Sequence, residues 1–206
     1  MRYTWAKFRL CRREQLNLFG PQKYNLKKRK DLPGQHGASM QRNSEYGKLL
    51  RNKQVVKRSY LLSEKQFSTI VKKTAAKYAK NNKMSHDFAL FQFLERRLDV
   101  IVLRSGLANT IMQARQMVTH GHFQLNGKKH NIPSTFVEVG DKISVKEKLK
   151  NSPLYANASK AAPAKVPSWL KVDKNAYAIE VLAMPQKGEI EPLGDLLKVI
   201  EFYARA

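Results

Sequence analysis

The sequence predicts an α+β protein that is mostly helical and includes two helices packed on a small antiparallel sheet. Helix-forming residues dominate 44–60 and 63–80, which predicts two long helices. From 91 to 118 apolar residues recur at spacings of three and four, and after 122 they alternate with polar residues, so helices should give way to strands. With 206 residues, 42% of them hydrophobic, the chain can form one sizeable domain or two small ones.

Residues 1–42 form the first segment and show no sustained helical or strand period. They contain Arg12-Arg13, Lys27-Lys28-Arg29-Lys30 and the turn-forming run Pro33-Gly34-Gln35-His36-Gly37. Such a segment buries too little apolar surface to offset the entropy of ordering it. We therefore expect an extended basic arm that becomes ordered when phosphates neutralise it. A solvated charge run is the alternative, but interleaved aromatic residues such as Tyr3 and Tyr24 could stack on bases.

The two long helices have recognisable starts. Ser63 and Gln66 have capping-box spacing ahead of the apolar residues Phe67, Ile70 and Val71. The helix over 44–60 would carry its cations at fixed spacing, which suits contact with a rigid polyanion.

Residues 88–147 give the clearest pattern. Phe91, Leu94, Leu98 and Ile101 predict the buried face of a helix that ends at Gly106, with Arg97 and Arg104 together on another face. A second helix should begin at Thr110 as N-cap, with Gln113 reaching back, and should stop at Gly121.

Strands follow these helices. Phe123 and Leu125 alternate with polar residues before Asn126-Gly127, a type I′ hairpin turn. Residues 136–139 and 142–146, separated by Gly140-Asp141, predict further half-buried strands. Residues 150–168 are rich in Ala, Lys, Ser and Pro and predict a linker or a broken helix. Beyond them we expect core residues at Trp169, Leu170 and Val172 and a short helix from about Gly194.

The net charge of the chain limits the functions that it can have. The chain carries 39 Lys and Arg against 16 Asp and Glu, a net charge of +23, and residues 1–60 alone hold 16 basic and 3 acidic side chains. Nucleic acid is the expected partner. A membrane surface would also attract this charge, but no apolar run approaches the roughly 20 residues that span a bilayer. The basic first residues lack the apolar stretch of a signal peptide, and Cys11 is the only cysteine, so we expect a reducing compartment inside the cell.

Metal binding and catalysis are weaker alternatives. His120, His122 and His130 resemble a metal cluster, but His120 falls in the last turn of a predicted helix, where a cation favours the dipole, and His122 could donate to phosphate. Glu95 and Asp99 lie beside arginines, so ion pairing is favoured over acid–base chemistry. No nucleophile motif or glycine-rich phosphate loop is present. RNA fits the scattered cations better than duplex DNA, because no base-reading recognition helix stands out.

These residues resemble the small-subunit ribosomal protein number four ("S-four") family, bacterial type, and the resemblance covers nearly the whole chain. The motifs that carry it are Arg2-Tyr3-Thr4, Arg9-Leu10-Cys11-Arg12-Arg13-Glu14, Pro33-Gly34-Gln35-His36-Gly37, Tyr46, Arg51, Lys53-Gln54, Ser63-Glu64-Lys65-Gln66-Phe67, Arg97-Leu98-Asp99, Gln113-Ala114-Arg115-Gln116, His120-Gly121-His122, Asn126-Gly127, Ile132-Pro133-Ser134, Gly140-Asp141, Trp169-Leu170 and Ile200-Glu201-Phe202-Tyr203.

The resemblance implies a structural constituent of the small ribosomal subunit that binds its rRNA early in assembly. It implies a basic arm at 1–42, a helical rRNA-binding domain at 43–88 and 151–206, and an inserted RNA-binding module at 89–150. It also implies a multi-helix rRNA junction, contact with small-subunit protein number five, an effect on decoding accuracy and a place near messenger RNA where it enters. The ribosome would be that of a bacterial cytoplasm or an organelle.

Two departures from the family pattern matter. Many members bind zinc through four cysteines in the arm, but here Phe8 stands three residues before Cys11 and no later cysteine exists. We therefore expect a zinc-free variant without cofactors. The module's second helix usually starts with Ser-Arg, whereas here Thr110-Ile111-Met112 lacks a cation, so no phosphate contact is expected there.

We expect no catalytic residues and no metal ligands. An RNA-modifying enzyme with the same module, as in pseudouridine synthases, is disfavoured because the chain after residue 147 is too short for a catalytic domain. A DNA-architectural protein is the other alternative. The expected RNA-binding residues are Arg2, Tyr3, Arg9, Arg12, Arg13, Gln35, His36, Tyr46, Arg51, Lys53, Lys57, Arg58, Arg97, Arg104, Arg115, His120, His122, Asn126 and Lys128.

Overall fold

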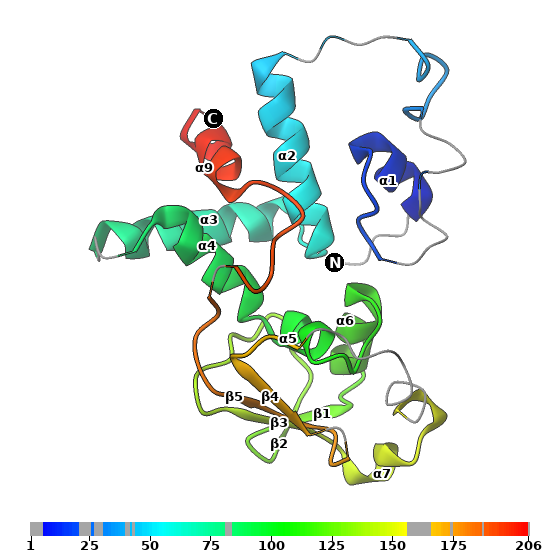
Figure 1. Ribbon diagram of the computed structural model, residues 1–206, viewed down its shortest axis with the longest axis vertical. Coiled ribbons are helices and arrows are strands. Elements are labelled where there is room, and N and C mark those ends of the chain that lie inside the picture. The colour runs from blue at the N-terminus through cyan, green and yellow to red at the C-terminus, as the bar shows by residue number, and fades with distance from the viewer. Residues whose placement is uncertain are drawn as a thin grey trace. The chain divides into compact units, whose positions relative to one another are not determined.

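The computed structural model divides the chain into two compact units (Figure 1). Unit 1 comprises residues 1–90 and 192–206, and unit 2 comprises residues 91–191. The structure describes residues 6–20, 26, 31–39, 42, 44–80, 84–155, 166–173, 175–186 and 188–205.

The regular secondary structure of unit 1 is helical within its described residues. Two predicted helices are confirmed as α2 (Glu45–Ser59) and α3 (Glu64–Lys80), and the predicted C-terminal helix is α9 (Leu196–Arg205). The capping box of α3 is complete, because the Gln66 N–H donates to Ser63 Oγ at 3.2 Å and the Ser63 N–H donates to Gln66 Oε1 at 3.3 Å. The start of α9 is tied to α2, since Asn52 donates to the Asp195 carbonyl and accepts from its N–H.

The packing of α9 on α2 depends on one glycine. A Cβ at Gly194 would lie 2.8 Å from Val56 Cγ2 and 3.0 Å from Asn52 Oδ1, so a larger residue would push the approach to α9 away from α2. Val199 and Phe202 of α9 are buried, as are Val55 and Val56 of α2. The closing segment of the chain therefore completes the core formed by residues about 140 positions earlier.

The prediction of a wholly extended arm is wrong at α1 (Lys7–Glu14), a helix whose Cys11 is fully buried. The hydrophobic face of α1 finds cover in tertiary contacts, which a search for long periodic runs does not detect. The loop 31–39 is held to α1, because Arg12 donates to the Asp31 and Leu32 carbonyls. The run Lys27-Lys28-Arg29-Lys30 lies outside the described residues.

Unit 2 packs α5 (Leu98–Arg104) and α6 (Ile111–Thr119) on a five-stranded antiparallel sheet of order β2-β1-β3-β5-β4 (Figure 1). The strands are β1 (Phe123–Leu125), β2 (Lys128–His130), β3 (Lys142–Val145), β4 (Leu170–Asp173) and β5 (Ala178–Val181), and a short α7 (Glu147–Lys150) follows β3.

The local signals for these elements are confirmed. Thr110 Oγ1 accepts from the Gln113 N–H at 3.1 Å and caps α6. Gly121 has φ +68° at the stop of α6, and Asn126-Gly127 has φ of +49° and +78°, as a type I′ turn requires. The core on one face of the sheet includes Phe123, Ile143, Val145, Ile179 and Val181, packed against both helices.

Two boundaries differ from the sequence expectation. The single helix expected through 91–104 is broken into α4 (His86–Glu95) and α5, because Arg97 is extended, with ψ 138°, and pairs with Phe136 in a β-bridge. The strand expected at 136–139 is reduced to that bridge. The inserted module expected to end at 150 extends to residue 191, because β5 pairs with β3 and β4 pairs with β5.

Candidate nucleic-acid interface

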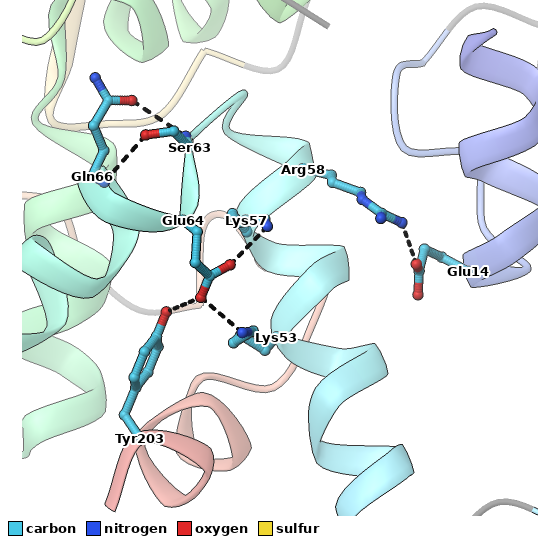
Figure 2. A network of polar contacts seen from close by, with 8 residues as sticks. All are labelled: Glu14, Lys53, Lys57, Arg58, Ser63, Glu64, Gln66 and Tyr203. Carbon is cyan, nitrogen blue, oxygen red and sulfur yellow. Dashed lines mark hydrogen bonds and ion pairs between the residues drawn. The ribbon is translucent and has the colours of Figure 1, made fainter. Parts of the chain in front are cut away.

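A buried carboxylate joins α1 to α2 in unit 1. Glu14 has a fully buried side chain and forms an ion pair with Arg51 at 3.2 Å. It forms a second ion pair with Arg58, which Figure 2 shows. Burial raises the pKa of Glu14, while the positive charges of Arg51, Arg58 and Arg13 oppose that rise. Arg51 keeps 39% of its side chain exposed and Arg58 keeps 18%. Arg51 therefore retains room for a phosphate, while Arg58 is mainly a tie between helices.

A second carboxylate joins α2, α3 and α9. Glu64 accepts from Lys53 Nζ at 2.7 Å, from Lys57 Nζ at 2.8 Å and from Tyr203 Oη at 2.7 Å (Figure 2). Partial burial disfavours the charge of Glu64, but these hydrogen bonds outweigh it and lower its pKa to about 2. Lys53 also lies over the Phe202 ring, 4.2 Å from its centroid. Four of the five cations of α2 thus divide into two pairs, each around one carboxylate, while Lys48 pairs with Glu45 on the same helix.

Unit 2 uses arginines in its interior. Arg97 and Asp99 form a bidentate pair at 3.1 and 2.8 Å, and Arg115 approaches the same carboxylate at 3.3 Å. Arg104 forms a bidentate pair with Glu95, at 2.9 Å for both hydrogen bonds. The side chains of Asp99 and Glu95 are fully buried. These ion pairs span the break between α4 and α5 and hold α6 beside α5.

The expectation that Arg97 contacts phosphate is wrong in this conformation, because its side chain is 2% exposed and committed to Asp99. The idea that Arg97 shares a helix face with Arg104 is also wrong, since each binds a different carboxylate. Arg104 and Arg115 are 27% and 15% exposed and already paired. For Lys53 and Lys57 the exposed fractions are 7% and 13%. The sequence thus located cations whose first role is to hold elements together.

Other predicted residues remain at the surface. Arg9 and Arg13 are exposed and four apart on α1, and neither side chain forms a hydrogen bond or ion pair with another described residue. Gln35 and His36 are exposed in the loop 31–39. Tyr46 is 60% exposed, with one face against Phe202. Arg2 and Tyr3 lie outside the described residues.

The structure also places the predicted residues of the hairpin region. His120 and Lys128 are exposed, whereas His122 Nδ1 is 3.0 Å from the buried Tyr155 hydroxyl. Burial, together with the neighbouring His120 and Lys146, lowers the pKa of His122. Asn126 is structural, because it donates to Asp141 and accepts from the Lys142 N–H.

Within the described residues, no group of three or more histidine, cysteine or acidic side chains is arranged to hold a metal. His130 instead contacts the Thr135 hydroxyl at 2.6 Å. Likewise, none of the described helices is long and apolar enough to cross a membrane.

Sequence reasoning missed three exposed lysines of α3, Lys65, Lys72 and Lys73. A signal was available for Lys72 and Lys73, since no carboxylate stands three or four residues away from either, so neither has an acidic partner on its own helix. The buried carboxylates of Glu14, Glu95 and Asp99 are thus paired with cations, while exposed lysines remain that form no ion pair with a described residue. A fold and a surface of this kind are typical of a basic RNA-binding protein.

Comparison with known proteins agrees with this class. The family model described as "Ribosomal protein S4/S9 N-terminal domain" matches residues 2–95, and the model described as "S4 domain" matches residues 96–143. The chain is 42% identical over 211 aligned residues to "Small ribosomal subunit protein uS4A" of Alkaliphilus metalliredigens and 41% identical to "Small ribosomal subunit protein uS4" of Clostridioides difficile. Each alignment covers 99% of both chains. The chain belongs to the uS4 family of small-subunit ribosomal proteins, whose members are structural RNA-binding proteins and not enzymes.

Proposed function

We propose that this protein is a structural constituent of the small ribosomal subunit and binds the subunit's rRNA early in assembly. The observation that carries the proposal is the identity of 41–42% along 99% of the chain to proteins named as small-subunit components. The net charge of +23 supports it, because such a surface requires a polyanionic partner.

The contacts inside unit 1 suggest how the protein presents its charge. Glu14 and Glu64 each hold cations from α2 against a neighbouring helix, so the helices are fixed before RNA arrives. Exposed side chains that form no ion pair with a described residue then remain for phosphates, namely Arg9, Arg13, Lys72 and Lys73. Because Arg51 is still 39% exposed, it can both pair with Glu14 and reach a phosphate at a junction of rRNA helices.

Finer features of the proposal follow from family membership. They are contact with small-subunit protein number five, an effect on decoding accuracy and a position close to messenger RNA where it enters. The relatives compared are bacterial, which favours a bacterial cytoplasmic ribosome, with an organelle ribosome as the alternative.

A zinc-free arm is also part of the proposal. A four-cysteine zinc site does not fit this chain, because Cys11 is its only cysteine. Cys11 is fully buried, and burial raises the pKa of its thiol, which favours the neutral form over the thiolate that a metal requires.

The test measures how the full-length protein binds small-subunit rRNA as salt is varied. The Arg9→Gln/Arg13→Gln variant should lower the slope of log affinity against log salt by about 2, since each lost phosphate contact is worth about 1. Lys48→Gln/Lys198→Gln is the matched control, because each lysine already has a carboxylate one turn away on its own helix or cap.

Two outcomes would reject the proposal. Wild-type protein that binds heparin or duplex DNA as tightly as small-subunit rRNA would be an unspecific polycation. A protein washed from small-subunit particles by salt that leaves other subunit proteins bound would not be a constituent.

A further inference from the structure

We propose that the face of the unit 2 sheet opposite α5 and α6, here called the outer face, is a second binding surface for the sugar–phosphate backbone of RNA. The inference rests on the proposed function and adds a surface to it. The residues that form the outer face are Gln124, Lys129, Lys142, Ser144, Lys146, Lys171, Asp173, Ala178 and Glu180.

Strand alternation places these residues on one side. Phe123, Leu125, Ile143 and Val145 point into the core with the two helices, so their neighbours in sequence point the other way. The register aligns them in rows. Lys129 pairs with Gln124 and Gln124 with Ser144, while Lys142 pairs with Glu180 and Glu180 with Lys171. Lys146 extends the pattern, because its N–H donates to the His122 carbonyl.

Two of the lysines converge without an anion between them. A Cβ added at Gly121 would lie 3.2 Å from Lys129 Cε and 3.6 Å from Lys146 Nζ. Neither lysine side chain forms a hydrogen bond or ion pair with any residue that the structure describes, and the same holds for the Lys171 side chain. Like charges brought together in this way repel each other, and a bound phosphate would relieve the repulsion.

The acidic residues of the face do not cancel these charges. Glu180 lies 3.6 Å from Lys142, whose side chain remains 73% exposed. Asp173, at the end of β4, accepts from the N–H groups of Asn175 and Ala176 and so stabilises the turn that follows β4. Glu180 is therefore paired at the middle of the face, and lysines remain around it.

The shape of the face also suits RNA. Its centre carries Ser144 and Ala178, which are short, so a nucleic acid backbone could approach the sheet closely. The side chains of Gln124 and Ser144 form no hydrogen bond with described residues and could bind 2′-hydroxyl or phosphate oxygens. Lys129 lies on β2 and Lys171 on β4, the two edge strands of the sheet. At about 4.8 Å per strand, these edge strands are about 19 Å apart.

A protein partner fits this face less well. Stable protein interfaces centre on buried aromatic or arginine anchors surrounded by apolar area, and the outer face offers lysines and small polar side chains instead. Lysine is among the residues depleted from such interfaces but serves well as a phosphate contact.

The experiment compares two variants of the full-length protein in binding to small-subunit rRNA over a range of salt. Lys129→Gln/Lys146→Gln removes the converging pair. Lys148→Gln/Lys150→Gln removes the same charge from α7 nearby, and Lys150 already has Glu147 as a partner at 2.7 Å. The first variant should lower the salt slope by about 2 and weaken binding at least several-fold, and the second should do neither. Lys171→Gln, added to the first variant, should lower the slope by about 1 more. Circular dichroism melts check that all variants stay folded.

Equal losses in the two double variants would overturn the proposal, because net charge alone would then explain the effect. Unchanged RNA binding by Lys129→Gln/Lys146→Gln, with weaker uptake into particles reconstituted with the other subunit proteins, would assign the face to a protein and also overturn it. Failure of the proposed function is a separate result, since wild-type protein would then show no preference for small-subunit rRNA over heparin.

Discussion

Both units place carboxylates beneath cations, but the cluster around Glu64 in unit 1 differs in its side chains and in its burial from the clusters around Asp99 and Glu95 in unit 2. In unit 2, Asp99 and Glu95 are fully buried and held by arginines in bidentate geometry. In unit 1, Glu64 is 47% exposed and held by two lysines and a tyrosine. An arginine fork satisfies a buried carboxylate with two fixed hydrogen bonds, whereas an ammonium suits a site that water still reaches. The comparison indicates that water reaches the carboxylate of Glu64 but not those of Asp99 and Glu95, so the loss of a buried carboxylate in unit 2 should cost more stability.

Removal of Asp99 should have the largest effect. Asp99→Ala leaves Arg97 buried without a partner and deprives Arg115 of a contact, so unit 2 should lose about 3–5 kcal/mol of unfolding free energy. Urea unfolding followed by Trp169 fluorescence in a Trp5→Phe background reports on this unit, because Trp169 is buried in its core.

Glu147→Gln is the control for this prediction. Glu147 is 84% exposed and pairs with Lys150 on the same short helix, so its loss should cost at most about 0.5 kcal/mol. A similar cost for Asp99→Ala and Glu147→Gln would show that burial does not distinguish the two ion pairs.

Glu64→Gln should have a smaller effect that depends on pH. The folded pKa of about 2 lies below the ordinary value of 4.5, so the charge of Glu64 stabilises the fold above pH 4.5, and this contribution is lost as the pH falls from 4.5 towards 2. Because the side chain is nearly half exposed, solvent screening reduces the contribution to about 1–2 kcal/mol.

The measurement is urea unfolding of wild type and Glu64→Gln at neutral pH and near pH 3, followed by hydrogen exchange of α2 and α3 amides. The difference between the two proteins should be largest at neutral pH and shrink near pH 3. A difference that grows on acidification would contradict the assigned direction of the pKa shift.

Loss of a helix cap should have the smallest effect of the three and should be similar in both units. Ser63→Ala and Thr110→Ala each remove one side-chain acceptor from the first turn of a helix, and each should cost about 1 kcal/mol. Ser63→Asp and Thr110→Asp, which restore an acceptor, should recover most of the loss in the same unfolding measurement. If the aspartates fail to recover it, the hydroxyls act by some means other than capping.

Features encoded by neighbouring residues were predictable from the sequence. The capping residues Ser63 and Thr110, the Asn126-Gly127 turn and the stop at Gly121 all depend on a few adjacent positions, and each was found where predicted. The α+β class followed from the same local periodicity.

Features that depend on distant partners were not predictable in this way. The helix is broken at Arg97 by a β-bridge to Phe136, and the spacing of apolar residues over 91–101 does not predict this break. The short strand β5 joins the sheet by pairing with β3, and β4 joins it by pairing with β5. For the candidate site, sequence identified the cations but not the carboxylates that hold them, since Glu14 lies 37 residues from Arg51.

The two ends of unit 1 are separated in sequence by all of unit 2, and this separation has a consequence for synthesis. While the chain is being translated, α2 leaves the ribosome long before α9. The hydrogen-bond partner of Asn52, Asp195, lies 143 residues later in the sequence. Unit 2 is complete at residue 191 and can fold first, whereas the nascent first unit lacks Val199 and Phe202 until both have been translated. A chain interrupted between residues 191 and 199 would therefore contain all of the second unit and an incomplete first one.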